Sequence, residues 1–357
     1  MRKKVGLTLA GLLVVLLIYL LFWPVPIDPV AWTPPDIPTL TGVYEENNRL
    51  AEVEILGKGV GFAPEDVAFD AQDRLYAGME DGRIIRFAHD GTNPELFADT
   101  GGRPLGMSFD ANGILIVADA FEGLLAITRD GAITVLTNEV NGQPILYADD
   151  LDIAADGTIF FSDASTKFSD DEFVFDLMEH RPNGRLLAFD PSSGSTRIVL
   201  DELYFANGVA VSPDQSFVLV VETGKYRVRR YWLAGPNQGN TDIFIENLPS
   251  IPDNITSNGE DTFWLALIGG PTHRQAFDLL LPLPFLRKVI LRLPLSLFPA
   301  PTGFGFVLGL DTNGEVLHNL QDPTGESFAD ITSVTEHGGM IYFGSIGEDA
   351  IGRLPAP

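Results

Sequence analysis

Four oxygen-bearing side chains occupy the same position of a repeated sequence pattern. They are Glu65, Asp149, Asn207 and Asp253, and each comes two residues before a predicted strand. Hard cations such as Ca²⁺ are bound by about six to eight oxygens from carboxylates, amides and water. Three carboxylates brought together would repel one another unless a cation lay between them. The pattern therefore indicates a calcium site, to which the adjacent Asn254 adds a further candidate ligand.

The two remaining equivalent positions hold Leu105 in the second repeat and, with a shift of one residue, Thr332 in the last. Asp150, next to Asp149, offers another carboxylate. The alternative interpretation is that all of these are ordinary turn residues, because Asp and Asn are common where strands begin. An oxygen that recurs at equivalent positions favours the metal site.

The repeat itself predicts the architecture. Six segments share a pattern of strand, polar turn and strand: 67–78, 107–118, 151–162, 209–220, 255–266 and, more loosely, 334–345. A third strand that begins with glycine follows most of them, and a fourth apolar strand often follows that. Four strands repeated six times predict an all-β, six-bladed β-propeller over residues 45–357. An open β-sandwich would not require the recurrence.

Propeller geometry explains how distant ligands could meet. The first strand of every blade lines the central channel, so equivalent positions become neighbours around one mouth of that channel. The last blade runs out of chain soon after Leu354, and we expect residues 51–56 to supply its outer strand and close the ring.

The first 23 residues differ sharply from the rest. Arg2, Lys3 and Lys4 precede an uncharged run of 19 residues, 5–23, which as a helix would extend about 28 Å and match a bilayer core. A cleaved signal peptide is the alternative, but no small-x-small site follows the run. We expect residues 1–23 to form a retained transmembrane anchor with a cytoplasmic N-terminus. The propeller would then lie in the periplasm, a lumen or outside the cell, behind a stiff proline-rich linker at residues 24–44.

Composition limits the partners. A formal net charge of −26 argues against nucleic acid, because no basic face could neutralise a phosphate backbone. The absence of cysteine excludes disulfides and thiol catalysis. We expect a monomer that contacts a membrane and a small-molecule substrate.

One insertion interrupts the repeats. Residues 269–303 are apolar and locally basic. This segment is interpreted as a partly helical cap over the mouth, as a surface that dips into the membrane interface, or as plain packing.

Several motifs resemble a known family. They include 63–70, 102–110, 184–191, 205–212 and 248–255. These resemble the strictosidine synthase-like family, and within it the adipocyte plasma membrane-associated proteins. More distantly the chain is similar to gluconolactonases, paraoxonases and diisopropylfluorophosphatase, which are six-bladed, calcium-dependent hydrolases. The resemblance implies calcium ligands at Glu65, Asp149, Asn207, Asp253 and Asn254, although related enzymes usually have asparagine at the position of Asp149.

Two departures restrict the chemistry that the resemblance implies. Leu105 stands where paraoxonases have a histidine, and Thr332 stands where the plant Pictet–Spengler synthases have their catalytic glutamate. We therefore expect calcium-dependent hydrolysis of esters or lactones, as by an arylesterase or lactonase. Asp253 and Glu65 are the candidate nucleophile or general base, unless both only bind metal. The alternatives are a non-enzymatic, calcium-stabilised propeller that binds a lipid or protein partner and, third, a strictosidine-type condensation.

Overall fold

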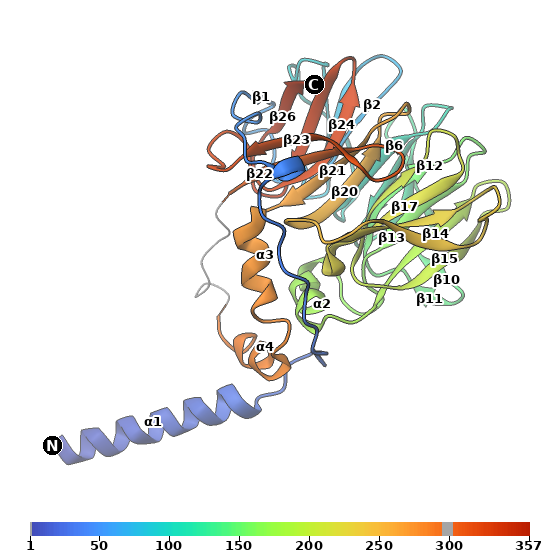
Figure 1. The fold of residues 1–357 in the computed structure, drawn as a ribbon. Helices are drawn as coiled ribbons and strands as arrows, with labels where there is room; N and C mark the ends of the chain where they lie inside the picture. Colours follow the sequence, from blue (N-terminus) through green and yellow to red (C-terminus); the bar gives the residue numbers. More distant parts are fainter. Residues whose placement is uncertain (1, 295–302) are drawn as a thin grey trace.

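The computed structural model of the chain describes residues 2–294 and 303–357 (Figure 1). Its strands form six four-stranded antiparallel sheets arranged as the blades of a propeller, which confirms the predicted all-β class. The blades, from inner to outer strand, are β2 (Val67–Phe69), β3 (Leu75–Gly78), β4 (Arg83–Phe87), β5 (Glu95–Asp99); β6 (Pro104–Phe109), β7 (Leu115–Asp119), β8 (Gly123–Ile127), β9 (Ile133–Thr137); β12 (Ala148–Ile153), β13 (Ile159–Asp163), β14 (Gly184–Asp190), β15 (Ser195–Leu203); β16 (Ala206–Val211), β17 (Phe217–Glu222), β18 (Arg227–Trp232), β19 (Thr241–Ile245); β20 (Ile251–Ser257), β21 (Phe263–Ile268), β22 (Gly305–Leu310), β23 (Val316–Asp322); and β24 (Ile331–His337), β25 (Met340–Ser345), β26 (Ile351–Pro355), β1 (Glu54–Leu56). A small hairpin, β10 (Glu139–Val140) and β11 (Gln143–Pro144), lies between the second and third blades.

The ring closes by pairing the two ends of the propeller. β1 is the outer strand of the last blade and pairs with β26, with Leu56 opposite Ile351. An ion pair of 2.7 Å between Arg353 and Glu54 lies along this seam. The predicted closing strand is thus confirmed, although it begins at Glu54 rather than at residue 51.

The core lies between adjacent blades. Strands in the middle of a blade are covered on both faces, so they are apolar without alternation; β17, for example, is buried along its whole length. Leu219 and Val221 of one blade pack with Phe263 and Leu265 of the next in one apolar cluster. Burial of each such side chain contributes roughly 1.5–3 kcal/mol to stability.

The helices of the ring are found in connections between second and third strands. They are η2 (Asp170–Glu172) and α2 (Phe173–Glu179), η3 (Thr223–Lys225), and α3 (Gly270–Asp278) and α4 (Pro284–Ile290). A second strand ends where its antiparallel inner strand begins, so these segments lie at the same end of the ring as the starts of the inner strands. The insertion is partly helical, as the sequence indicates, and its residues 295–302 lie outside the described part of the chain.

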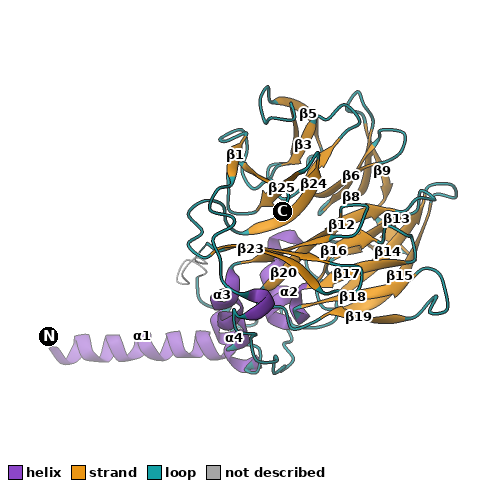
Figure 2. Cartoon of the chain, turned by 45° about the horizontal axis from the view of Figure 1, so that its top comes forward, coloured by secondary structure: helices purple, strands orange, loops and turns teal. Residues whose placement is uncertain are grey.

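Residues Arg2–Phe22 form α1, which projects from the propeller beside α4 (Figures 1 and 2). Among the residues that the structure describes, no helix is long and apolar enough to cross a membrane, so the transmembrane helix expected at residues 1–23 is not supported.

Residues 24–41, here called the strap, contain no helix or strand and are held along the helical insertions. The Val30 amide donates to the Glu179 carbonyl, and the Trp32 amide donates to that of Leu281, each at 3.1 Å. The 3-10 helix η1 (Gly42–Tyr44) follows the strap.

Candidate metal centre

The predicted ligands lie in irregular starts of the inner strands. Register shifts occur between Ala148 and Leu151 in β12, and comparable shifts occur in β16 and β20. Such bulges bend a strand and re-aim its side chains. Asp149, Asn207 and Asp253 therefore lie inside their strands rather than two residues before them, as the sequence pattern had indicated, because each strand begins earlier with a pair ahead of the bulge.

The structure brings these side chains together in the buried centre of the ring. Glu65 is 6% exposed, Asp149 2%, Asn207 4%, Asp253 4% and Asn254 1%. The Asn207 amide donates a hydrogen bond to Asp253 Oδ1. The charges of Glu65 and Asp253 act on Asp149, which connects the other two residues to this pair. The four residues are here called the axial cluster: Glu65, Asp149, Asn207 and Asp253.

Burial and mutual repulsion disfavour the charged forms of the three carboxylates. Burial raises the pKa of Asp253 from 3.8 to about 7, although the hydrogen bond from Asn207 lowers it in part. Burial, followed by the charges of Glu65 and Asp253, raises the pKa of Asp149 well above its usual range. The pKa of Glu65 is also raised, first by burial, while the positive charge of Arg103 lowers it. A cation within the cluster would oppose all of these shifts.

The axial cluster and Asn254 together offer carboxylate and amide oxygens. The described residues contain no group of three or more histidine, cysteine, aspartate or glutamate side chains spaced to hold a metal ion. The predicted donor set also includes amides, and the buried oxygens Asp149 Oδ1, Asn207 Oδ1 and Asn254 Oδ1 have no hydrogen-bond partner. A buried oxygen without a partner costs roughly 1–3 kcal/mol. These oxygens have the chemistry that Ca²⁺ prefers, so the residues fit such an ion.

Close contact between blades positions the cluster. A Cβ atom on Gly208 would lie 2.3 Å from the backbone nitrogen of Ile255, so only glycine allows β16 and β20 to approach this closely. The Thr332 hydroxyl donates to the Glu65 carbonyl at 2.7 Å and joins the last blade to the first. The Thr332 hydroxyl hydrogen is therefore used to support the backbone of Glu65, a predicted ligand.

A second set of carboxylates was not recognised from the sequence. Asp119, Asp163 and Glu222 each end the second strand of a blade, and all three are completely buried. Each accepts a backbone N–H from the segment that enters its inner strand, at 3.0–3.1 Å. These bonds hold that segment just ahead of the bulge. The recurrence of an acid at this position in three successive repeats was a usable signal.

Three further polar residues adjoin the axial cluster. Arg103 Nη2 lies 3.8 Å from Glu65 Oε2, and both side chains are buried. Asp170 lies in η2, where burial raises its pKa, whereas the neighbouring Tyr147 side chain and the Arg103 charge lower it. The charge of Asp170 also raises the pKa of Asp149, which places it near the cluster. No sequence pattern pointed to Asp170, because the connection between β13 and β14 does not share a sequence pattern with the corresponding connections of the other blades.

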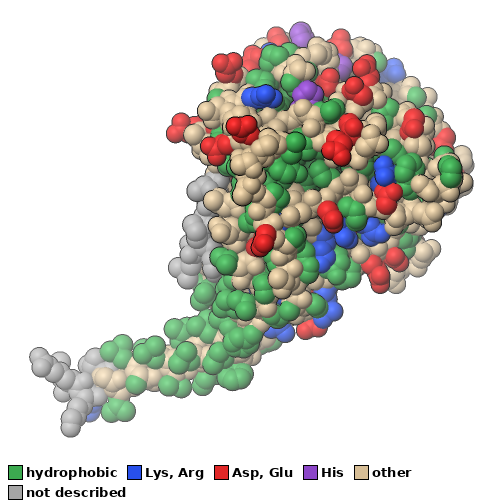
Figure 3. All heavy atoms as spheres, viewed as in Figure 1, with side chains coloured by type: hydrophobic (Ala, Val, Ile, Leu, Met, Phe, Trp, Pro, Cys, Tyr) green, Lys and Arg blue, Asp and Glu red, His purple; other side chains and the backbone are tan. Residues whose placement is uncertain are grey.

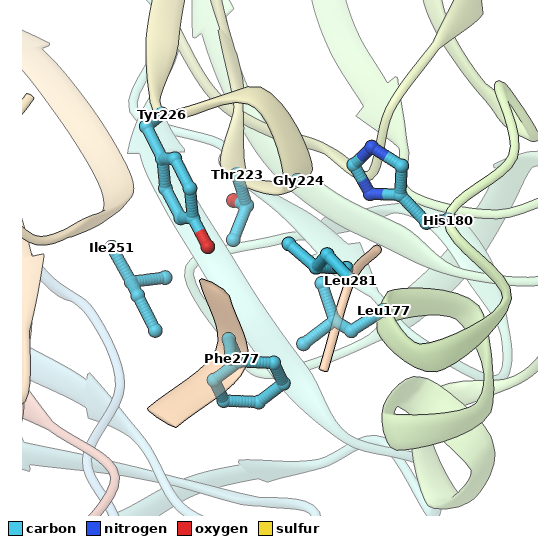
Figure 4. Close-up of a pocket in the computed structure, with 8 residues that line it drawn as sticks. All are labelled: Leu177, His180, Thr223, Gly224, Tyr226, Ile251, Phe277 and Leu281. Carbon is cyan, nitrogen blue, oxygen red and sulfur yellow. The ribbon is translucent and has the colours of Figure 1, made fainter. Parts of the chain in front are cut away.

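A small cavity of about 20 Å³ lies among the helical connections (Figure 4). It is lined by Leu177, His180, Thr223, Gly224, Tyr226, Ile251, Phe277 and Leu281. His180 is buried and stacks on Trp32 of the strap with ring centroids 4.6 Å apart. Burial lowers the pKa of His180 to about 3, so its imidazole is neutral at ordinary pH. The lining is mostly apolar, and Ile251 belongs to the strand that carries Asp253.

Known proteins with this fold include small-molecule enzymes. A gluconolactonase from Xanthomonas campestris superposes with a TM-score of 0.63 at 18% identity and covers 93% of this chain and 99% of its own. A calcium-binding regucalcin from Agrobacterium tumefaciens superposes with a TM-score of 0.57 at 12% identity, covering 82% and 90% respectively. At these identities the likeness establishes the fold alone.

Sequence comparison is more specific. The strictosidine synthase family matches residues 149–236, and the N-terminal region of the strictosidine synthase-like family matches residues 42–87. Strictosidine synthase-like protein 4 of Arabidopsis thaliana is 36% identical over 339 residues, covering 92% of this chain and 88% of its own. An adipocyte plasma membrane-associated protein of Bos taurus is 33% identical over 349 residues, covering 92% and 84%. The chain belongs to the strictosidine synthase-like family.

Proposed function

We propose that the protein is a calcium-dependent hydrolase of esters or lactones that acts at the axial cluster. The observation that carries this proposal is a buried group of carboxylates and amides whose oxygens lack partners, at the centre of a fold shared with gluconolactonases. A strictosidine-type condensation is not proposed, because Thr332 supports the Glu65 backbone at the position where that chemistry needs a carboxylate.

Glu65, Asp149, Asn207 and Asp253 would hold the calcium ion, with Asn254 as an additional ligand. A bound calcium ion supplies electrostatic stabilisation of negative charge on a substrate oxygen and lowers the pKa of a coordinated water. The protein's own part is to keep the ligand oxygens buried and fixed through the bulges and the close blade contacts.

Proton transfer at this site requires a carboxyl group. Asp253 and Glu65 are candidates for the general base or nucleophile. Asp170 is a third candidate, because its charge acts on Asp149 of the cluster and its raised pKa suits a group that exchanges protons.

One observation favours a second function. The ligand side chains are nearly inaccessible, with no more than 6% of any of them exposed. A fully enclosed calcium ion would stiffen the ring without contacting a substrate. In that case the protein is a non-enzymatic, calcium-stabilised propeller that binds a lipid or protein partner.

Hydrolysis assays distinguish the two functions. Purified full-length protein in detergent is incubated with a panel of aryl esters and lactones, then with EDTA, and then with restored calcium. Hydrolysis that EDTA abolishes, that calcium restores and that Asp253→Asn removes supports the hydrolase. The matched control is Asp201→Asn, since Asp201 is exposed on the outer strand β15. A melting temperature that responds to calcium, without turnover of any substrate, supports the second function and contradicts the first.

We also propose that α1 associates with a membrane. Apolar side chains around this helix are exposed, among them Leu7 at 75%, Leu12 at 63% and Leu16 at 50%. An exposed apolar surface of this kind is typical of contact with lipid. The adipocyte plasma membrane-associated relatives are named for such an association. Co-sedimentation of the full chain with lipid vesicles tests the proposal.

A further inference from the structure

The helical insertion of the fifth blade is attached to the end of α1. The Arg292 guanidinium donates to the Trp23 carbonyl at 2.6 Å and to the Leu20 carbonyl at 2.9 Å. The Tyr19 hydroxyl donates back to the Arg292 carbonyl at 3.0 Å. A cation at a helix C-terminus satisfies the last carbonyls and complements the helix dipole. α1 is therefore fixed against the insertion by these contacts rather than joined to the propeller only through a linker.

The strap strengthens this attachment. Ile27 is buried and packs in one apolar cluster with Met178 of α2, and Val25, Ile290 and Leu291 pack against that cluster. The buried Arg287 of α4 donates to the Val30 and Leu281 carbonyls. One side of the insertion is thus occupied by the chain that leaves α1.

Other apolar side chains of the insertion have no such cover. Leu279 is 68% exposed, Leu283 47%, Phe285 62% and Leu286 40%. These four residues are here called the α4 patch. In space filling, apolar side chains run along α1 and continue onto the lower part of the body next to it (Figure 3). The α4 patch and α1 are therefore neighbouring apolar surfaces.

The insertion has an excess of basic residues, although the net charge of the chain is −26. Residues 269–294 contain four Lys and Arg residues and a single Asp. Of the four, Lys288 is partly exposed and the other three are buried. Lys288 lies on α4, close in sequence to Phe285 and Leu286, and Asp28 joins it to Arg181: the two basic side chains are 35% and 40% exposed, and both contact Asp28. Basic side chains at the rim of an apolar patch suit a surface that carries anionic headgroups.

We propose that the α4 patch is a second membrane-contact surface, which docks on the anionic lipid bilayer that α1 also contacts. This inference rests on the proposed membrane association of α1 and adds a fixed orientation to it. α3 and α4 follow a second strand, so they lie at the end of the ring where the inner strands carry the axial cluster. Docking would turn that end toward the lipid, and the mouth would draw lipophilic esters or lactones from the membrane surface.

Site-specific fluorescence tests the docking, because the chain contains no cysteine and a single one can be introduced and labelled. Full-length Phe285→Cys carries an environment-sensitive label and is added to vesicles of phosphatidylcholine and phosphatidylglycerol that contain spin-labelled, quenching lipids. Leu12→Cys reports on α1. Leu96→Cys is the matched control, because Leu96 is 60% exposed on β5, an outer strand of the first blade.

We expect the lipids to quench the labels at residues 12 and 285 severalfold more strongly than the label at residue 96. Iodide in the water should quench the label at 96 and leave the one at 285 protected. Quenching by lipid at 12 but not at 285 overturns this inference and leaves the association of α1 standing. No lipid quenching at either position contradicts both. Protection at 285 from iodide without quenching by lipid would assign the patch to a second copy of the chain and overturn the inference. None of these readings depends on hydrolysis, so the proposed activity is judged separately.

Discussion

The buried charge of Asp253 should make the metal-free protein sensitive to pH. Burial raises the pKa of Asp253 from 3.8 to about 7. A difference of about three pH units corresponds to about 4 kcal/mol, at about 1.4 kcal/mol per unit. Because the folded pKa lies above the unfolded one, the folded protein binds more protons within this window. Metal-free protein should therefore lose stability as the pH rises from about 4 to about 7, and Asp253→Asn should remove the part of that loss that Asp253 causes.

Urea unfolding in EDTA, followed by the fluorescence of the four tryptophans, measures this effect. At pH 8 we expect metal-free Asp253→Asn to be more stable than the wild type, by up to about 4 kcal/mol. At pH 4.5 the difference should fall to about 1 kcal/mol. Asp201→Asn, on an exposed part of β15, should match the wild type at both pH values. A variant that is less stable than the wild type at pH 8, or equally displaced at both pH values, would refute the reasoning.

Three other substitutions give separable outcomes. Gly208→Ala should abolish the calcium-dependent rise in melting temperature, because its Cβ would meet the Ile255 nitrogen at 2.3 Å and force β16 and β20 apart; an unchanged calcium response would contradict this. Asp170→Asn should lower hydrolysis roughly 100-fold and keep the calcium response, as expected of a proton-transfer group that is not a ligand; equal loss of both would make it a ligand or a structural residue instead. Arg287→Met should destabilise the protein by about 3 kcal/mol, because the Met178 and Val30 carbonyls would lose their donor; Lys288→Met, on the partly exposed side of α4, is the control and should cost less than about 0.5 kcal/mol.

The sequence predicted the ring because every blade repeats the same local chemistry. A segment such as β17 is apolar at successive positions, and polar turns separate it from its neighbours at regular intervals. Counting strands also predicted that residues near the N-terminus close the ring. The pairing of Glu54–Leu56 with the last blade confirms this prediction.

The predicted ligand residues were picked out because they recur at the same position of the repeat. The structure gives that position a physical origin that the sequence could not supply. Bulges in β12, β16 and β20 place Asp149, Asn207 and Asp253 inside the strands. A bulge is a property of strand pairing. The sequence pattern therefore showed which residues are equivalent, but not that a bulge places them inside the strands. Glu65 alone precedes its strand.

The surroundings of the cluster were less accessible to sequence reasoning. Arg103 contacts Glu65 only in the folded ring, and Asp170 comes from the helical connection between β13 and β14. The strap was expected as a proline-rich linker, and its attachment depends on single arginines such as Arg274, whose guanidinium donates to the Pro35 carbonyl at 2.8 Å. Contacts between segments more than 200 residues apart leave no local periodicity to detect.

The calcium content of the purified full-length protein tests the central claim most directly. Mass spectrometry should find bound calcium in the native protein. EDTA should remove it and lower the melting temperature, and added calcium should restore both. Glu65→Gln, which keeps the shape of the side chain but removes a charge, should bind calcium much more weakly. Protein that contains no calcium, and whose melting temperature does not respond to calcium or EDTA, would contradict the account.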